Sequence, residues 1–246
     1  MNTYPVIFVP DVHAQWPHWP SIKCLLNIIP QVHAKEIVFL GDFFDVYSLS
    51  RYRKNPQKAY ALFDQEVRPC TDLLHTIVAA SKCRKVTFLE GNHEQRILKY
   101  IEEKCPAFIN YLKPRDILGI DPKWRYIPYG QGGYYKIRDL IVTHGTLCSK
   151  HVCFNMIQKY HADVLFGHTH RVQIYTTRTW DGKVLKAYNI GWLGDFKKAA
   201  PYVEDVPDWC HAFAIGWFYR GGYTIQIVNI DSGKAVFNGE LYSQKR

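Results

Sequence analysis

Five short polar clusters in the sequence carry side chains that could bind metal ions. Each joins carboxylate, imidazole or amide groups to small residues, and each follows a short apolar run. The clusters are Asp11-Val12-His13, Gly41-Asp42-Phe43-Phe44-Asp45, Gly91-Asn92-His93-Glu94, Thr143-His144-Gly145 and Gly167-His168-Thr169-His170. Oxygen and imidazole ligands suit divalent ions of intermediate hardness such as Mn²⁺, Fe²⁺ or Zn²⁺, and the lack of thiolates in these clusters argues against a structural zinc site.

The number of candidate ligands points to a pair of metal ions. The candidates are Asp11, His13, Asp42, Asn92, His144, His168 and His170. A single open catalytic metal usually takes three or four protein ligands. One shared carboxylate and three further ligands on each ion would use the whole set. Each motif alone has an ordinary structural explanation, since Asn92 could simply cap a helix; the combination is what favours a metal centre.

The apolar runs before the clusters are expected to be β-strands that aim the loops at one point. In the first half, strands at 6–9, 36–40 and 85–89 alternate with helical patterns at 19–29, 56–80 and 94–103, which predicts a largely parallel sheet. In open α/β sheets the loops at the carboxyl ends of strands form the ligand crevice. Five polar loops at five strand ends can therefore converge.

The second half of the chain is richer in predicted strands. They lie at 124–127, 133–137, 140–143 and 164–166, a helix is expected at 148–160, an Asp181-Gly182 hairpin follows, and a final strand pair spans 212–220 and 223–230. Two sheets packed face to face would accommodate both halves. We predict one domain over residues 1–246, with 106–132 as an insertion near the site.

In this order the motifs resemble those of the calcineurin-like metallophosphoesterase superfamily, and Asn189-Ile190-Gly191 resembles its closing Asn-x-Gly strand. The resemblance implies an α/β fold, a four-layer αββα sandwich with two central mixed β-sheets. It also implies roles for the site residues. Asp11, His13 and His170 would bind one metal, Asn92, His144 and His168 the other, and Asp42 both. His93 would approach the substrate phosphate, oriented by Asp45.

The strings 41–51 and 91–96 look most like a phage- or prophage-type branch of this superfamily. Asp45 is followed by Val46-Tyr47, whereas protein serine/threonine phosphatases have Arg-Gly there. His93 stands where lipid A precursor pyrophosphatases carry Arg. Both of these activities are therefore less favoured.

The resemblance implies hydrolysis of a phosphate ester by a hydroxide that bridges two metals, because paired cations lower the pKa of bound water. Asn92 would help hold the phosphate oxygens, and His93 would stabilise or protonate the departing oxygen. The expected cofactors are two divalent ions, with Mn²⁺ the first choice and Fe, Zn, Mg, Ni or Co as alternatives.

Composition narrows the partners and the compartment. Apolar residues make up 47% of the 246 residues, which excludes global disorder. The odd number of cysteines, seven, without a C-x-x-C pair argues against a disulfide framework. No signal peptide or membrane-length apolar run is evident, so we expect a protein of the cytoplasm (the host cytoplasm if phage-encoded) with no membrane partner. The net charge of +9 fits an anionic substrate, although solubility explains it equally well.

Several side chains near the motifs are candidates for substrate contact: Trp16, His18, Arg51, Arg53 and Arg96. Trp16 and His18 could stack on a base, although packing against the first helix is favoured for Trp16. The arginines could bind phosphate; the alternatives are a solvated helix for Arg51 and Arg53, and an ion pair with Glu102 or Glu103 for Arg96. The aromatic-rich stretch 209–223 is interpreted as packing in a core sheet.

The leading hypothesis is hydrolysis of phosphate esters of nucleotides or nucleic acid. The modest size slightly favours a nucleotidase, a phosphomonoesterase, over a nuclease, a phosphodiesterase. The alternatives are a non-catalytic scaffold with the same fold and a nucleic-acid-binding module.

Overall fold

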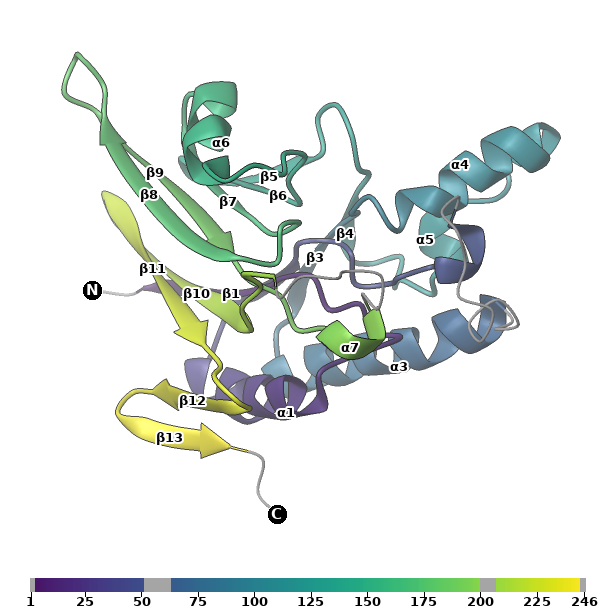
Figure 1. Ribbon diagram of the computed structural model, residues 1–246, viewed down its shortest axis with the longest axis horizontal. Helices are drawn as coiled ribbons and strands as arrows, with labels where there is room; N and C mark the ends of the chain where they lie inside the picture. Colours follow the sequence, from purple (N-terminus) through teal and green to yellow (C-terminus); the bar gives the residue numbers. More distant parts are fainter. Residues whose placement is uncertain (1–2, 51–62, 200–206, 244–246) are drawn as a thin grey trace.

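The computed structural model describes residues 3–50, 63–199 and 207–243, and its elements are arranged around two β-sheets packed face to face (Figure 1). The predicted α/β sandwich with two mixed sheets is confirmed. Within the described part of the chain, no helix combines the length and the apolar character that crossing a membrane requires.

The first sheet contains six strands in the order β11-β10-β1-β2-β3-β4. Their bounds are β1 Tyr4–Val9, β2 Glu36–Phe39, β3 Lys85–Leu89, β4 Arg125–Ile127, β10 Ala212–Tyr219 and β11 Gly222–Asn229. Strands β1 to β4 are parallel, whereas β10 runs antiparallel to both of its neighbours. The parallel set matches the strand–helix alternation of the sequence, and it brings the loops after β1, β2 and β3 to one edge.

The second sheet contains five strands in the order β5-β6-β7-β9-β8. Their bounds are β5 Tyr134–Ile137, β6 Leu140–Thr143, β7 Asp163–Phe166, β8 Val172–Arg178 and β9 Val184–Ile190. Strands β6, β7 and β9 are parallel, and the edge strands β5 and β8 are antiparallel to them. The β8–β9 hairpin turns at the predicted Asp181-Gly182 signal.

Helices cover the outer faces of both sheets (Figure 1). The longer ones are α1 Trp19–Ile28, α3 Phe63–Ser81, α4 Gln95–Lys104 and α6 Val152–Tyr160; α5 Pro114–Ile117 and α7 Phe196–Ala199 are short, and 3-10 turns occupy Ile29–Val32, Tyr47–Leu49 and Pro106–Phe108. One apolar cluster joins α1 and α3 to the first sheet, a second fills the space between the sheets, and a third lies under α6. The layers are therefore helix, sheet, sheet and helix.

Some boundaries differ from the sequence-based expectations. Helix α6 begins at Val152 and not at residue 148, and a C-terminal hairpin, β12 Lys234–Phe237 with β13 Glu240–Ser243, was not predicted; it packs beside α1 (Figure 1). The helix expected at 56–80 is seen as α3, and its first residues lie outside the described ranges. The segment 106–132 contains α5 and supplies β4 to the edge of the first sheet.

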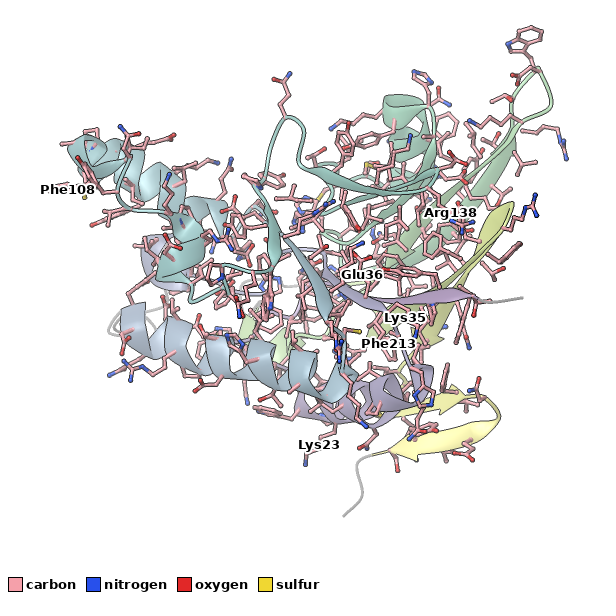
Figure 2. The ribbon with its side chains drawn as sticks, turned by 180° about the vertical axis from the view of Figure 1, so that it is seen from behind. Lys23, Lys35, Glu36, Phe108, Arg138 and Phe213 are labelled. Carbon is pink, nitrogen blue, oxygen red and sulfur yellow. The ribbon has the colours of Figure 1, made fainter. Side chains whose placement is uncertain are left out.

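A buried polar group ties the two sheets together at the amino-terminal ends of the strands, opposite the clusters. Its centre is Glu36, labelled in Figure 2, whose side chain is fully buried. Lys85 Nζ lies 2.9 Å from the Glu36 carboxylate, and Tyr4 and Thr87 donate hydrogen bonds to it, each at 3.1 Å. Lys85 also donates to the Tyr135 hydroxyl of the second sheet at 2.8 Å. The buried charge is thus paired, as burial requires.

Candidate metal centre

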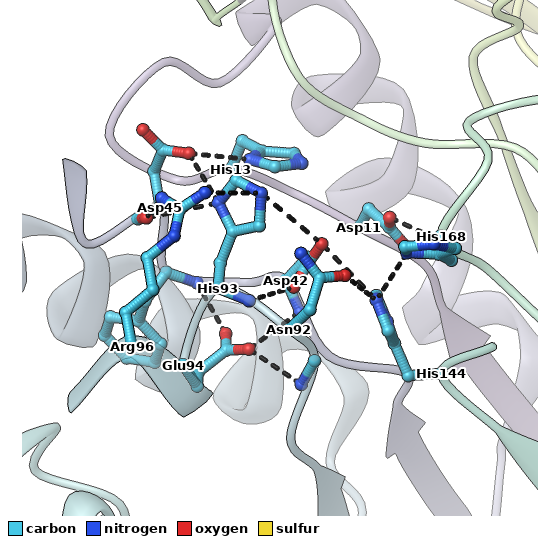
Figure 3. Close-up of polar contacts among 12 residues, drawn as sticks. Asp11, His13, Asp42, Asp45, Asn92, His93, Glu94, Arg96, His144 and His168 are labelled. Atoms are coloured by element: carbon cyan, nitrogen blue, oxygen red, sulfur yellow. Dashed lines mark hydrogen bonds and ion pairs between the residues drawn. The ribbon is translucent and has the colours of Figure 1, made fainter. Parts of the chain in front are cut away.

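The candidate ligands all lie in loops that follow the carboxyl ends of strands. The first sheet supplies Asp11 and His13 after β1, Asp42 after β2 and Asn92 after β3; the second sheet supplies His144 after β6, and His168 and His170 after β7. The structure brings these loops together across the interface between the sheets (Figure 3).

Four of these residues have left-handed backbone conformations, which are uncommon outside glycine. The φ angles are 45° at His13, 47° at Asp42, 70° at His168 and 61° at His170. Such conformations persist only where the surroundings hold them, and they concentrate at functional sites. The chain thus turns sharply in the loops after β1, β2 and β7, which carry these four residues.

The first cluster contains Asp11, His13 and His170. Nε2 of His170 lies 3.2 Å from Oδ2 of Asp11 and 3.2 Å from Nε2 of His13. The backbone N–H of His168 donates to both Asp11 carboxylate oxygens at 3.0 Å. This bond between loops of different sheets fixes the carboxylate beside the two imidazoles.

The second cluster contains Asp42, His144 and His168, with Asn92 beside them. Nε2 of His144 lies 3.0 Å from Oδ1 of Asn92, 3.1 Å from Nδ1 of His168 and 3.3 Å from Oδ2 of Asp42. Nδ1 of His144 lies 2.9 Å from the carbonyl oxygen of Leu40. Donation to that carbonyl leaves the Nε2 lone pair directed into the cluster.

The donor atoms of both clusters fit divalent cations. Around Nε2 of His144, three potential ligand atoms converge within 3.3 Å, and hydrogen bonding to one ring nitrogen cannot satisfy all of them. The same crowding brings the Nε2 atoms of His13 and His170 together. A cation in each cluster would resolve these contacts, and carboxylate, amide and imidazole are the ligands it would take.

A third group, formed by His13, Asp45 and His93, lies beside the first cluster. Oδ1 of Asp45 lies 2.8 Å from Nδ1 of His93, as the predicted orienting role requires, but it also lies 3.2 Å from Nδ1 of His13. Arg96 donates to the Asp45 carbonyl oxygen at 2.7 Å, and its Nη2 lies 3.2 Å from Nε2 of His93. Asp45 is therefore shared between two imidazoles.

Mutual charge sets the ionisation of these buried groups. Burial raises the pKa of the Asp45 carboxyl, yet hydrogen bonds with His13 and His93 outweigh it and hold that pKa well below its usual range. Burial likewise opposes ionisation of Asp42, but His144 and His93 keep its pKa well below the ordinary value. Burial lowers the pKa of His144, and the Asp42 carboxylate overrides it and raises that pKa to about 9. Both carboxylates are thus ready to accept positive charge.

Glu94 fastens the two loops that carry Asp42 and Asn92. Its buried carboxylate accepts hydrogen bonds from the backbone N–H groups of Asp42 at 2.9 Å, Phe44 at 2.8 Å and Gly91 at 2.8 Å (Figure 3). The sequence places Glu94 in a motif but does not reveal this role. On the opposite side of Asp42, the His93 N–H donates to its Oδ1 at 2.8 Å.

The predicted substrate-contact residues have different positions. Arg96 lies against His93 and Asp45, not against Glu102 or Glu103. The His18 ring stacks on His211 at 4.2 Å, and His211 stacks on Trp192, so His18 lies outside the two clusters. The Trp16 backbone is tied to His13 and Asp195. Arg51 and Arg53 lie outside the described residues.

Two tryptophans that were not predicted as site residues contact the first cluster. Trp192 stacks on the His170 ring, and Trp209 meets that ring edge to face. The interpretation of Trp209 as packing in a core sheet is wrong, because it precedes β10 in a loop that returns to the site. Trp192 follows the Asn189-Ile190-Gly191 motif directly, and this adjacency is the one sequence signal that pointed to it.

Comparisons with known proteins find a matching family and a similar fold. The family model described as calcineurin-like phosphoesterase matches residues 4–172. The gene 54 proteins of Mycobacterium phages D29 and L5 are 24% and 26% identical to the chain, and each alignment covers 96% of this chain and 98% of the phage protein. The structure of vacuolar protein sorting 29 from Cryptosporidium parvum has a TM-score of 0.52 at 12% identity, with 98% of this chain and 99% of that chain covered, a similarity of fold alone.

Proposed function

The chain belongs to the calcineurin-like phosphoesterase family, and from this premise we propose that it is a dinuclear-metal-dependent phosphoesterase acting on nucleotides or nucleic acid. The similarity to phage members expected from the motifs is confirmed. The observation that carries the proposal is the convergence of two clusters of carboxylate and imidazole groups at one edge of the two sheets. The phage relatives support a site of action in the host cytoplasm.

In this proposal the two clusters hold two divalent ions, with Mn²⁺ as the first candidate. Asp11, His13 and His170 would hold one ion, Asn92, His144 and His168 the other, and Asp42 would be shared. Bound there, the ions would supply positive charge for the phosphoryl oxygens and would lower the pKa of water. The backbone N–H of His93 and the carboxylate of Glu94 keep Asp42 and its loop in place for this shared role.

His93 and Arg96 would act on the substrate directly. Nδ1 of His93 lies 2.8 Å from Oδ1 of Asp45, so Nε2 is the ring atom that would act on the departing oxygen. The Arg96 guanidinium lies 3.2 Å from that same atom, and both side chains are only partly buried. Arg96 is thus placed to bind a phosphate oxygen next to His93, where a planar guanidinium binds two oxygens at once.

Charge and aromatic side chains favour a nucleotide or nucleic acid as the substrate class. The chain carries a net charge of +9, and the Tyr129 ring lies 5.7 Å from that of His144. As argued from size, a nucleotidase is slightly favoured over a nuclease. A non-catalytic scaffold or a plain nucleic-acid-binding module would need neither the complete ligand set nor His93, so both are less favoured.

The decisive experiment compares the parent protein with Asp42→Asn, using p-nitrophenyl phosphate and its bis-ester with Mn²⁺. We expect Asp42→Asn to abolish hydrolysis and Asp181→Asn, at the exposed hairpin turn, to leave it unchanged. Near-normal turnover by Asp42→Asn would contradict the two-metal assignment. A panel of mononucleotides, cyclic nucleotides, and single- and double-stranded DNA and RNA then separates nucleotidase from nuclease activity. Strand binding that survives chelation, without any hydrolysis, would favour the binding-module alternative.

A further inference from the structure

The imidazole of His170 lacks the polar support that other candidate ligands have. His144 Nδ1 faces the Leu40 carbonyl oxygen at 2.9 Å, and His13 Nδ1 faces Asp45 at 3.2 Å. His170 directs Nε2 at Asp11 and His13, while its Nδ1 is buried without a hydrogen-bond partner among the described residues. A metal-binding histidine normally donates its second ring N–H to an oxygen, which fixes the plane of the ring.

Two indole rings surround His170 in place of such an oxygen. Trp192 is stacked on the imidazole, with ring centroids 4.6 Å apart and planes 13° apart. Trp209 meets the same imidazole at 4.4 Å and 84°. The two indoles contact each other at 4.9 Å and 72°, so they form two adjoining walls. Rings in these orientations attract one another and resist rotation of the ring between them.

The backbone fastens both indoles to the ligand loops. The N–H of Cys210, next to Trp209, donates to the His170 carbonyl at 2.8 Å, and the N–H of Trp192 donates to the Cys210 carbonyl at 3.1 Å. The N–H of Leu193, next to Trp192, donates to the Asp11 carbonyl at 2.7 Å. Each indole is therefore held in register with the ligand that it supports. Phe196 braces the far side of Trp209, edge to face at 5.6 Å.

We propose that Trp209, together with Trp192, is a positioning residue for His170, whose ring plane the two indoles hold in place of a hydrogen bond to Nδ1. This inference rests on the proposed function, because it assigns His170 to a metal. It makes the two metal positions unequal, since one depends on aromatic packing and the other on the bond between His144 and Leu40. Removing the Trp209 ring should weaken the position that uses His170 and leave the other intact.

The test measures metal affinity, and Trp209 is the better target. Trp192 is 1% exposed and its loss threatens the fold, whereas Trp209 is partly exposed in a loop. Metal-free parent, Trp209→Phe and Trp209→Ala are titrated calorimetrically with Mn²⁺, and thermal melting followed by circular dichroism checks the fold. The control is Trp180→Ala, which removes an indole that is 99% exposed.

We expect Trp209→Ala to weaken one of two Mn²⁺ equivalents by roughly 10- to 100-fold, the usual effect of losing a ligand's outer partner, and to leave the other unchanged. Trp209→Phe, which keeps an aromatic ring, should retain most of the parent's affinity for Mn²⁺. Trp180→Ala should bind Mn²⁺ as the parent does. Unchanged binding of both equivalents in Trp209→Ala would overturn the inference, and so would equal weakening of both. If the parent protein binds no metal, the proposed function fails together with this inference. If the parent binds two ions and hydrolyses aryl phosphates, the proposed function stands and the Trp209 variants alone decide this inference.

Discussion

Gly91 and Asp42 are packed so closely that a Cβ atom on Gly91 would lie 2.1 Å from Oδ1 of Asp42. The glycine belongs to the loop that carries Asn92, and the aspartate is the proposed shared ligand. Their contact sets how near the loops after β2 and β3 can approach. The position of Asp42 thus depends on the absence of a side chain one loop away.

Substituting Gly91→Ala should displace the Asp42 carboxylate, whose Oδ1 accepts a hydrogen bond from the His93 N–H, because the added methyl group would take the space that Oδ1 occupies. A displacement of about 1 Å at a catalytic centre can cost roughly 100-fold in rate, so we expect a loss of at least that size. Steady-state hydrolysis of an aryl phosphate measures it. Gly222→Ala is the control, since a Cβ there would meet only the Tyr219 side chain. Equal rates for the two variants would contradict the packing argument.

Glu94→Gln tests the hydrogen bonds that the Glu94 carboxylate accepts from the backbone N–H groups of Asp42, Phe44 and Gly91, in the loops after β2 and β3. An amide keeps one acceptor oxygen but turns an N–H₂ group toward a backbone N–H, which leaves at least one buried donor unpaired. We expect the free energy of unfolding to fall by about 1–3 kcal/mol, together with reduced hydrolysis. Urea denaturation measures the first effect, and the exposed Glu102→Gln serves as the reference. A variant as stable as the reference would show that these bonds contribute nothing.

His93→Ala should separate catalysis from metal binding. The His93 side chain is assigned to the substrate and not to a metal, so we expect the variant to retain both ions by elemental analysis. Its rate should fall by roughly 10²–10⁴, the usual contribution of a general acid or base. Loss of an ion would instead make His93 a ligand.

Asp45→Asn should behave differently, because Asp45 contacts His13 as well as His93. The neutral amide can still accept a bond from one imidazole, but it removes the charge that faces both. We expect the rate to fall, as in His93→Ala, and Mn²⁺ to bind more weakly at the position that uses His13. Calorimetric titration of the metal-free variant measures the second effect. Parent-like affinity at both positions would restrict Asp45 to orienting His93.

Lys85→Met tests the ion pair between the buried Glu36 and the half-exposed Lys85 at the opposite end of the sheets. It leaves the Glu36 carboxylate with Tyr4 and Thr87 as donors but without a cation, so we expect a loss of about 1–3 kcal/mol in stability. Burial opposes ionisation of Lys85, but hydrogen bonding to Glu36 raises its pKa above the ordinary value. Because the pKa of Lys85 is raised in the folded state, its contribution to stability is fully present below the unfolded-state pKa of about 10.4. This contribution is lost only as the pH rises above that value. The difference between variant and parent should therefore be constant from pH 6 to 9, as measured by denaturation at each pH.

The fold and the convergence of the loops that carry the candidate ligands could be predicted because their signals are local. A β-branched or aromatic run that ends in glycine and a polar group shows both the strand and its functional end, as at 37–42 and 86–92. The parallel order follows from the intervening helices, and it carries the polar groups to one edge. The contact of Asp45 with both His13 and His93 could not be predicted, because it depends on how the three loops after β1, β2 and β3 lie relative to one another in the folded chain.

The aromatic support of His170 could not be predicted for a related reason. Trp209 lies three residues before Ala212, and in the sequence it leads directly into the apolar run that forms β10. Only the return of this loop beside β9 brings it to His170. The β12–β13 hairpin was missed because its strands are short and its exposed face is mixed, so alternation there is weak.

Each proposed metal position draws side chains from both sheets, and His13 and His170 are 157 residues apart in the chain. A ribosome that has translated the first sheet's parallel strands has made Asp11, His13, Asp42 and Asn92 but none of the partner imidazoles. Under the proposed function, a product terminated before β7 would lack His168 and His170 and would be inactive. The second sheet is complete at β9, and β10 and β11 of the first sheet follow it in the chain, so under the proposed function hydrolysis would report that both sheets have formed.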